Sequence, residues 1–311
     1  MALIGLDIMG GDFAPQKALE GAAQWLRSHP ETASALCFFG TKEALDAAKE
    51  IFPNQVKLIE APQIIGYNEH PVKALKEKQQ SSIAMGFGAL ASGKIDAFIS
   101  AGNTGAMLVG SMFSLKMVSG IQRPTIATII PRPQGKTGWL LDVGINSDCK
   151  PELLNQFASI GAAYASSILG IQNPKVGLLN IGEEEGKGNQ LAQQAYPLLK
   201  ANSHINFCGN MEGRDILTDG ADVIVCDGFT GNIILKLLES LYPITKSQGV
   251  EHEYFDRFHF EQYGGTPVLG VEKPVIIGHG VSGELAFAKM IELADKMIAE
   301  NFLPSLATWV D

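Results

Sequence analysis

Short strand-like runs alternate with longer helical patterns along the whole chain, and this alternation limits the folds available to it. The run Leu3–Ile8 precedes a helical pattern over Gln16–Ser28, and the clearest helical pattern, Glu284–Asn301, comes near the end. Alternating strands and helices form a mostly parallel sheet flanked by helices. The sequence therefore predicts an α/β fold over residues 1–311, as a single domain with two lobes whose boundaries the pattern does not locate.

The alternation also places each expected element. The strands are expected at Leu3–Ile8, Leu36–Gly40, Val56–Ala61, Ala97–Ser100, Thr125–Ile130, Trp139–Val143, Val176–Ile181, Asn206–Gly209, Val223–Cys226 and Val275–Gly278. The helices are expected near Gln16–Ser28, Lys42–Ile51, Ser82–Ser92, Met107–Val118, Glu152–Leu169, Leu191–Ala201, Ile233–Leu241 and Glu284–Asn301. Ligands of such sheets bind where strands end and helices begin, so the loops after the strands are the places to search.

Charge and composition exclude several classes of protein. The 311 residues carry 24 Lys and Arg against 33 Asp and Glu, a net charge of -9, which argues against a nucleic-acid partner because phosphate backbones require a basic surface. The N-terminus lacks the basic stretch of a signal peptide. The charge-free windows Ala97–Leu115 and Leu153–Pro174 are interrupted by polar residues, so neither predicts a membrane span. We expect a cytoplasmic protein.

The four cysteines do not form a metal or redox motif, because no pair has the Cys-x-x-Cys spacing. Three of them, Cys37, Cys208 and Cys226, lie in strand-like apolar runs, and we expect buried free thiols there. The expected helix Glu152–Leu169 is rich in Gly, Ala and Ser. Such a helix either packs within its own subunit or contacts a second copy, and the sequence leaves both possibilities open.

A repeated loop is the most informative local feature. The pattern Gly-x-Ser/Thr-Gly follows three expected strands, within Ala101–Gly105, Asp227–Asn232 and His279–Gly283. Glycine allows the backbone to approach a ligand closely, and free N–H groups at a helix start bind anions. One such loop would be an ordinary turn, but three at strand-to-helix junctions favour a ligand of the phosphate type.

Two further loops belong with these three. Met9–Pro15 follows the first strand and holds Gly10, Gly11 and Asp12. Gly182–Asn189 places Lys187 between glycines just before a helix, where its ammonium group could hold an anion or a developing oxyanion. The alternative for Lys187 is a solvated lysine in a turn.

Standard catalytic motifs are near misses. Gly182–Gly188 resembles a Walker loop with a short spacer and no Ser or Thr, and Gly278–Gly283 fits a dinucleotide motif but is followed by too little chain for a βαβ unit. There is no nucleophile elbow and no His-Glu-x-x-His motif. His279 is either catalytic or a structural residue of its loop. A set of aspartates either binds a metal or has a structural role, anchoring loop N–H groups or pairing with lysines, and we favour the structural role: Asp7, Asp12, Asp142 and Asp227.

Taken together, these segments resemble the bacterial phosphate acyltransferases of phospholipid synthesis, the acyl-carrier-protein:phosphate transacylases of the PlsX family. The matching segments run in the family's order and cover nearly the whole chain: residues 7–12, 100–106, 141–144, 150–152, 177–182, 187–189, 227–232, 263–265 and 279–280. The resemblance implies a fold like that of isocitrate and isopropylmalate dehydrogenases, shared with phosphotransacetylases. It also implies a homodimer that converts acyl-carrier protein thioesters and inorganic phosphate to acyl phosphate. A membrane glycerol-3-phosphate acyltransferase would then use this product.

The chain departs from the family in one segment. Members usually carry a longer apolar and basic helical stretch between Leu241 and Gly264, through which they dock peripherally on the membrane. Here the stretch is short and acidic-aromatic, which suits an anionic membrane poorly. Its aromatic residues either cover the core or line an acyl groove, and peripheral docking is an open expectation.

The expected reaction is attack of a phosphate oxygen on a thioester carbonyl. Phosphate is already anionic near neutral pH, and the leaving thiol has a pKa of roughly 8.5, so the site requires N–H donors and a cation rather than a nucleophilic triad, a cofactor or a metal. We assign catalysis to Lys187, Asn232, Asp227 and His279. We assign phosphate or substrate binding to Asp7, Gly10, Gly11, Asp12, Gly102, Asn103, Thr104, Gly105, Gly188, Asn189, Thr230 and Gly231.

An acidic carrier protein requires a basic landing patch on this acidic chain. The candidates are Lys73, Lys76, Lys78, Arg132 and Lys136, and the alternative for the lysines from 73 to 78 is a solvated helix face. Two other activities remain open. One is a short-chain acyl-CoA phosphotransacylase, and the other is a non-enzymatic scaffold that binds acyl-carrier protein. A dehydrogenase on the same fold is disfavoured, because no usable nucleotide loop is found.

Overall fold

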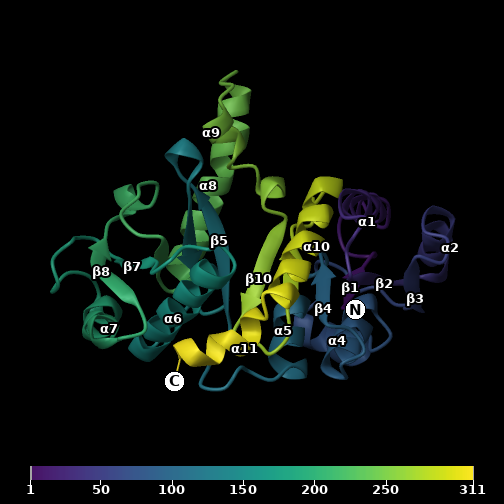
Figure 1. The fold of residues 1–311 in the computed structure, drawn as a ribbon, viewed down its shortest axis with the longest axis horizontal. Coiled ribbons are helices and arrows are strands. Elements are labelled where there is room, and N and C mark those ends of the chain that lie inside the picture. The colour runs from purple at the N-terminus through teal and green to yellow at the C-terminus, as the bar shows by residue number, and fades with distance from the viewer. Residues whose placement is uncertain (1, 311) are drawn as a thin grey trace. The chain divides into compact units, whose positions relative to one another are not determined.

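The computed structural model describes residues 2–310 and divides into two compact units. Unit 1 comprises Met1–Lys116 and Phe260–Asn301, and unit 2 comprises Met117–His259 and Phe302–Asp311. Unit 1 is therefore built from both ends of the chain, purple to blue and yellow-green to yellow in Figure 1. Each unit is an α/β structure with its own part of the sheet and its own helices.

Unit 1 holds a mostly parallel sheet in the order β3-β2-β1-β4-β11-β10. Only β10 runs antiparallel, against β11. The strands are β1 Leu3–Asp7, β2 Ala35–Gly40, β3 Val56–Glu60, β4 Ala97–Ser100, β10 Gly265–Leu269 and β11 Val275–Gly278. The helices are α1 Gln16–Ser28, α2 Lys42–Ile51, α3 Pro71–Glu77, α4 Ser82–Ala91, α5 Thr104–Ser114 and α10 Glu284–Ala299. The parallel strands β1, β4 and β11 are neighbours, so their carboxyl ends and the loops that follow lie along one edge.

Helices α1 and α10 pack side by side, although they come from opposite ends of the sequence (Figure 1). Gly21 makes this approach possible, because a side chain there would collide with Phe287 and with the carbonyl oxygen of Glu284. On the other side α10 contacts β4 and β11, and its apolar residues Phe287, Ile291 and Ala294 are almost completely buried. The one-sided apolar pattern of Glu284–Asn301 therefore marks a helix that covers the sheet.

Unit 2 holds five strands in the order β5-β6-β9-β7-β8. They are β5 Thr125–Pro131, β6 Thr137–Leu141, β7 Lys175–Leu179, β8 Asn206–Met211 and β9 Val223–Val225, with only the β5–β6 hairpin antiparallel. The helices are α6 Pro151–Ser167, α7 Gln190–Ala201, α8 Gly228–Ser247, α9 Glu253–Asp256 and α11 Phe302–Leu306. Because β6, β9 and β7 are parallel neighbours, the loops after them lie together at one edge of this sheet.

The small-residue helix α6 is part of the core of unit 2. Gly161 faces Val223 and Leu141 of the sheet, where a side chain would collide with both, and Ala158 and Ala162 have no exposed surface. The helix also contacts α7 and α11 of the same unit. Its small residues let it approach the sheet closely, so the prediction of a helix that packs within its own subunit is confirmed.

The elements agree with the predicted alternation except at a few places. The sequence missed β10, which carries Pro267 and lies between glycines, and it missed the short helix α3. The expectation of buried thiols holds for Cys37 and Cys226 but is wrong for Cys208, which is exposed, and all four cysteines are free. Among the residues that the structure describes, no helix is long and apolar enough to cross a membrane.

Candidate functional site

Asp7, at the end of β1, is an anchor for its own loops. Its carboxylate is 1% exposed, accepts a hydrogen bond from the Ser100 hydroxyl at 2.7 Å, and accepts another from the N–H of Met9 at 2.9 Å. Burial raises the pKa of Asp7, although hydrogen bonds from these and neighbouring groups oppose the rise. The side chain joins the ends of β1 and β4.

The glycines after β1, β4 and β11 bring three loops together within unit 1. A side chain at Gly10 would collide with the backbone N of Gly102, and Gly11 has a φ of 109°, which glycine adopts readily. The N–H of Asp12 donates to the carbonyl oxygen of Gly280 at 2.7 Å, and the Asp12 carboxylate is exposed. The predicted loops of this unit are thus neighbours.

The Asn103 side chain has a structural role. It is 4% exposed, and its Oδ1 accepts from the N–H of Ala106 and so caps α5. Its Nδ2 donates to the carbonyl oxygens of Gly66, Tyr67 and Glu69 at 2.9–3.1 Å. No donor of this side chain is left for a ligand.

Asn103 caps only one of the backbone N–H groups at the start of α5. The N–H groups of Thr104 and Gly105 have no partner among residues 2–310, and Thr104 is exposed. Free N–H groups at a helix start are suited to bind an anion. His279 lies on the neighbouring loop, half-buried, with its ring 4.8 Å from that of Phe260, and its carbonyl oxygen accepts from the N–H of Ser282.

In unit 2, Asp142 organises the loop that follows β6. Its buried carboxylate accepts from the N–H groups of Gly144 and Asn146 and from Asn146 Nδ2, at 2.7–3.2 Å. Asn146 in turn accepts the N–H of Gly228 on its carbonyl oxygen at 2.7 Å. A side chain at Gly231 would collide with the carbonyl oxygen of Asp142. Anchoring, rather than metal binding, accounts for Asp142, and it fixes the start of α8.

Asp227 is the N-cap of α8. Helix α8 begins at the first residue of its Gly-x-Thr-Gly motif, whereas α5 begins at the third residue of the corresponding motif. The Asp227 carboxylate accepts from the N–H of Thr230 at 2.8 Å and from its hydroxyl at 2.9 Å. The segment was expected to be a loop, and the structure shows the first turn of a helix instead. The Thr230 hydroxyl already donates to Asp227, so it has no proton left for phosphate.

Lys187 lies on an exposed turn before α7. Its side chain is 52% exposed, and its Nζ lies 3.9 Å from a carboxylate oxygen of Glu184, a loose ion pair in water. Asn180 Nδ2 donates to the carbonyl oxygen of Lys187 at 3.1 Å, and Gly188 follows with a φ of 95°. The turn therefore has a fixed backbone, while the ammonium group can move onto an anion.

The helix start beside Lys187 adds N–H donors. Asn189 caps α7 by accepting from the N–H of Ala192 at 2.9 Å, which leaves the N–H groups of Gln190 and Leu191 without a partner in the part of the chain that the structure describes. A helix start with two free amides and a flanking lysine is suited to bind an anion. The sequence predicted Gly188 and Asn189 but missed the two amides.

Asn232 is exposed on the first turn of α8, and its Nδ2 lies over Gly144, where a Cβ would come within 2.8 Å of it. It is free to donate to a ligand at that position. The predicted phosphate residues are thus divided between the two units: Gly10, Gly11, Asp12, Gly102, Thr104 and Gly105 lie in unit 1, and Gly188, Asn189, Thr230 and Gly231 lie in unit 2.

Sequence reasoning missed a cavity of about 980 Å³ inside unit 2. Asn180, Gly188, Asn189, Asp227 and Thr230 line one part of it, and apolar side chains from β7, α7 and α8 line most of the remainder. We call it the unit 2 cavity. The apolar spacing along α8 is the sequence signal that could have indicated it, but this pattern also fits an ordinary core-facing helix.

The carrier-binding residues differ in exposure. Lys73 and Lys76 are exposed on α3, and Lys73 pairs loosely with Glu77 at 4.0 Å. Lys78 is half-buried and bound to Glu69 at 2.6 Å. Lys136 is exposed at the tip of the β5–β6 hairpin.

Arg132 is 2% exposed, so its place in the landing patch is wrong: it cannot present its charge to a partner. Its guanidinium fills the space that a side chain at Gly138 of the neighbouring strand would need. Burial lowers the pKa of Arg132, while Asp222 and Asp219 nearby oppose this effect.

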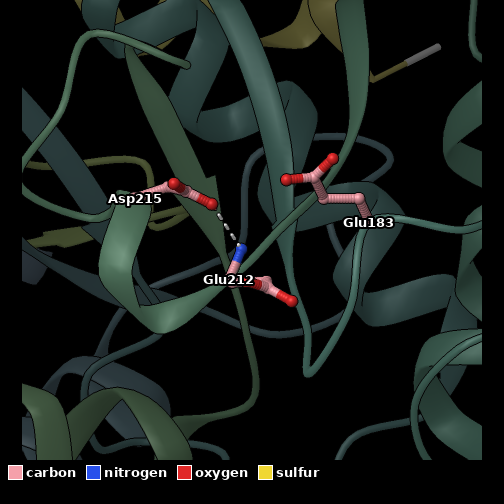
Figure 2. Close-up of side chains that lie close together, drawn as sticks. All are labelled: Glu183, Glu212 and Asp215. Carbon is pink, nitrogen blue, oxygen red and sulfur yellow. Dashed lines mark hydrogen bonds between the residues drawn. The ribbon is translucent and has the colours of Figure 1, made fainter.

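Three carboxylates gather beside the Lys187 turn, at Glu183, Glu212 and Asp215 (Figure 2). One oxygen of each lies within 4.8 Å of the others. Arg214 pairs with Glu212 at 2.6 Å and with Glu183 at 3.6 Å, and Asp215 accepts from the N–H of Glu212 at 3.0 Å, the bond dashed in Figure 2. These contacts account for the cluster as a capped turn neutralised by arginine, and we assign no metal to it.

The fold is that of the phosphotransacetylases. A phosphotransacetylase from Streptococcus pyogenes matches with a TM-score of 0.66 at 16% identity, over 96% of this chain and 94% of that one. A branched-chain phosphotransacylase from Enterococcus faecalis V583 matches with a TM-score of 0.65 at 15% identity, over 96% and 99% of the two chains. At these identities the likeness concerns the fold alone.

The chain belongs to the fatty acid synthesis protein family, whose model matches residues 2–304. A relative named phosphate acyltransferase from Halothermothrix orenii is 42% identical, covering 96% of this chain and 95% of the relative. A phosphate acyltransferase from Aquifex aeolicus is 41% identical, covering 97% and 95%. The predicted α/β fold and the predicted family are thereby confirmed.

Proposed function

We propose that this chain is a phosphate acyltransferase that converts acyl-[acyl-carrier protein] and inorganic phosphate to acyl phosphate and free acyl-carrier protein, for phospholipid synthesis. The names of its relatives support the reaction class. The observation that carries the proposal on this chain is the arrangement around Lys187. An exposed lysine and two unpartnered helix amides flank Gly188 and Asn189, and these two residues line a large, mostly apolar cavity.

The chemistry follows from the charges involved. A phosphate oxygen attacks the carbonyl carbon, the carbonyl oxygen becomes an oxyanion, and the carbon–sulfur bond then breaks to release the thiolate, which takes up the proton that phosphate loses. Lys187 and the amides of Gln190 and Leu191 would hold phosphate, and Asn232 would donate to the oxyanion. Asp227 positions Thr230 and the start of α8. No step requires a cofactor or a metal.

The carrier protein is proposed to land on α3. Lys73 and Lys76 are both exposed there, and an acidic partner would bind such a pair through complementary charge. Reversing both charges (Lys73→Glu with Lys76→Glu) should raise the KM for the carrier substrate about tenfold without changing the KM for phosphate. Lys42→Glu with Lys49→Glu, on exposed α2, is the matched control. An unchanged KM would exclude α3 as the landing site.

A homodimer is proposed through α8. Phe229 and Ile233 of this helix are 63% and 54% exposed, and a second copy could cover them. Sedimentation of the wild type and of Ile233→Glu should show a dimer and a monomer, respectively. A monomeric wild type would reject this part of the proposal.

Peripheral membrane association is proposed at the far end of α8, where Ile244 and Val250 are exposed, so that the acyl phosphate passes directly to a membrane glycerol-3-phosphate acyltransferase. Co-sedimentation with vesicles containing anionic lipid tests this part. Protein that stays in the supernatant at low salt would exclude a membrane contact of its own.

The deciding experiment is to incubate purified protein with palmitoyl-carrier protein and phosphate and to measure acyl phosphate. Palmitoyl-carrier protein should be used far faster than acetyl-CoA. Preference for acetyl-CoA would support a short-chain phosphotransacylase instead, and carrier binding without turnover would support a scaffold.

A further inference from the structure

The apolar part of the unit 2 cavity has no role in the chemistry described above. Its wall is formed by Leu178 of β7, Leu191 of α7 and Ile216 after the turn shown in Figure 2, together with Ile234, Leu238 and Leu241 of α8. All of these residues belong to unit 2, so one unit supplies this wall, and the cavity is open to the surface where the lining residues Ile181 and Leu237 are exposed.

The cavity is polar at one end. Gly188 and Asn189, which precede the free amides of α7, line it together with Asp227 and Thr230 at the start of α8. The other charged lining residues are Glu212 and Arg214, which neutralise each other at 2.6 Å. A ligand that fits this distribution has a polar group at one end and a long uncharged part.

The wall of α8 gives the cavity a direction. Thr230, Ile234, Leu238 and Leu241 are spaced by four, four and three residues, so they lie on one face of the helix. At 1.5 Å per residue this face runs about 16 Å from its polar to its apolar end. The length suits an extended alkyl chain, and the volume of about 980 Å³ lies near the top of the range for small-molecule sites.

We propose that the unit 2 cavity binds the fatty acyl chain of the thioester, with the carbonyl carbon beside Gly188 and Thr230 and the methyl end towards Leu241. This inference rests on the proposed function and identifies the subsite that determines the preference for acyl-chain length. Each methylene of the alkyl chain that is buried in the cavity should increase the binding affinity by up to about fourfold. The KM should therefore fall steeply with chain length until the alkyl chain reaches Leu241.

The experiment uses a graded pair of variants. Ile234→Trp, near the polar end, should raise the KM for octanoyl-, dodecanoyl- and palmitoyl-carrier protein alike. Leu241→Trp, at the far end, should raise the KM for the palmitoyl substrate about tenfold and leave the octanoyl substrate unchanged. Leu198→Trp, on the part of α7 that does not line the cavity, is the matched control and should match the wild type for all three.

A second measurement does not depend on turnover. Sodium palmitate should bind the wild type and Leu198→Trp in a calorimetric titration, and Ile234→Trp should abolish this binding. The inference is overturned if the wild type does not bind palmitate, or if the folded Leu241→Trp variant keeps the wild-type preference for chain length. It is also overturned if Leu241→Trp only changes the oligomeric state, because the cavity is then an interface between copies. Palmitate binding without acyl phosphate formation would instead reject the proposed function and leave the subsite standing.

Discussion

The two units use similar glycine-rich loops in different ways. In unit 1 the polar side chains Asp7, Ser100 and Asn103 are buried and bound to each other's loops. In unit 2 Lys187 and Asn232 are exposed. The difference shows that a Gly-x-Thr-Gly motif at a strand end does not by itself identify the residues that touch a substrate.

The register of the helix explains part of this difference. Helix α5 begins at Thr104, the third residue of its motif, so the Asn103 side chain is used as the cap. Helix α8 begins at Gly228, the first residue of its motif, so the cap is Asp227, outside the motif. The comparison predicts that substitutions in unit 1 loops act mainly on stability and that substitutions at exposed unit 2 positions act mainly on rate.

The largest effect is expected at Lys187. Lys187→Ala should lower acyl phosphate formation by about two orders of magnitude, because it removes the cation that neutralises phosphate and oxyanion charge. Steady-state kinetics with palmitoyl-carrier protein measure this loss. Lys200→Ala, which removes an equally exposed lysine of α7, is the control and should retain activity. Wild-type turnover by a folded Lys187→Ala variant would contradict the assignment.

Asn103 should show the opposite behaviour. Asn103→Ala removes a helix cap and buried hydrogen bonds to three carbonyl oxygens, and should lower the free energy of unfolding by about 2 kcal/mol. Urea denaturation measures this change, and Asn68→Ala, at an exposed position of the loop to which Asn103 donates, should leave the stability unchanged. If Asn103→Ala keeps the wild-type unfolding midpoint but no longer binds phosphate, Asn103 contacts the substrate and the structural role is wrong.

Asn232 gives a smaller test on the unit 2 side. Asn232→Ala should lower kcat about tenfold with little change in KM or in the free energy of unfolding, because the exposed amide acts on the developing oxyanion. Asn232→Gln, which keeps an amide donor, should recover part of the rate. If both variants retain the wild-type kcat, Asn232 does not touch the reacting atoms.

The smallest expected effect is the pH dependence caused by Asp7. Burial raises the pKa of the Asp7 carboxyl in the folded chain above its usual value of 3.8. At pH values between the usual pKa and the raised pKa, the folded chain therefore binds more protons than the unfolded chain. The free energy of unfolding therefore falls as pH rises through this window. Asp7→Asn removes the fall, so the stability of the variant relative to the wild type should increase with pH.

Denaturation curves from acidic to neutral pH measure this relative stability. Lys49 lowers the pKa of Asp46, so Asp46→Asn should give a slope of the opposite sign. Equal slopes for the two variants would show that Asp7 is not desolvated in the folded chain.

Much of the fold was predictable because the signal is repeated. Most strands of the predicted set are short apolar runs, which burial on both faces of a parallel sheet favours, whereas the edge strands β3 and β8 are partly exposed. Strand β10 was missed because Pro267 and its flanking glycines weaken the local pattern, and its pairing with β11 comes from tertiary contact. The first turn of α8 was missed because glycines obscure a helix start that Asp227 determines.

The site was predictable only as far as residue type indicates chemistry. Lys187 was singled out because glycines flank it just before an expected helix. The burial of Arg132 was not visible in the sequence, because it depends on the space left by Gly138 across a hairpin. The cavity was missed for a related reason: it is formed by apolar residues whose spacing is the same whether they face a core or a ligand.

The contact between α1 and α10 has a consequence for synthesis of the chain. Unit 1 completes its sheet only when β10 and β11 have been made, although its first four strands are the first to leave the ribosome. All five strands of unit 2 are translated before that point, so they can assemble before α10 is available to cover the apolar face of α1. A nascent chain released before α10 would therefore expose that face, and we expect it to require a chaperone.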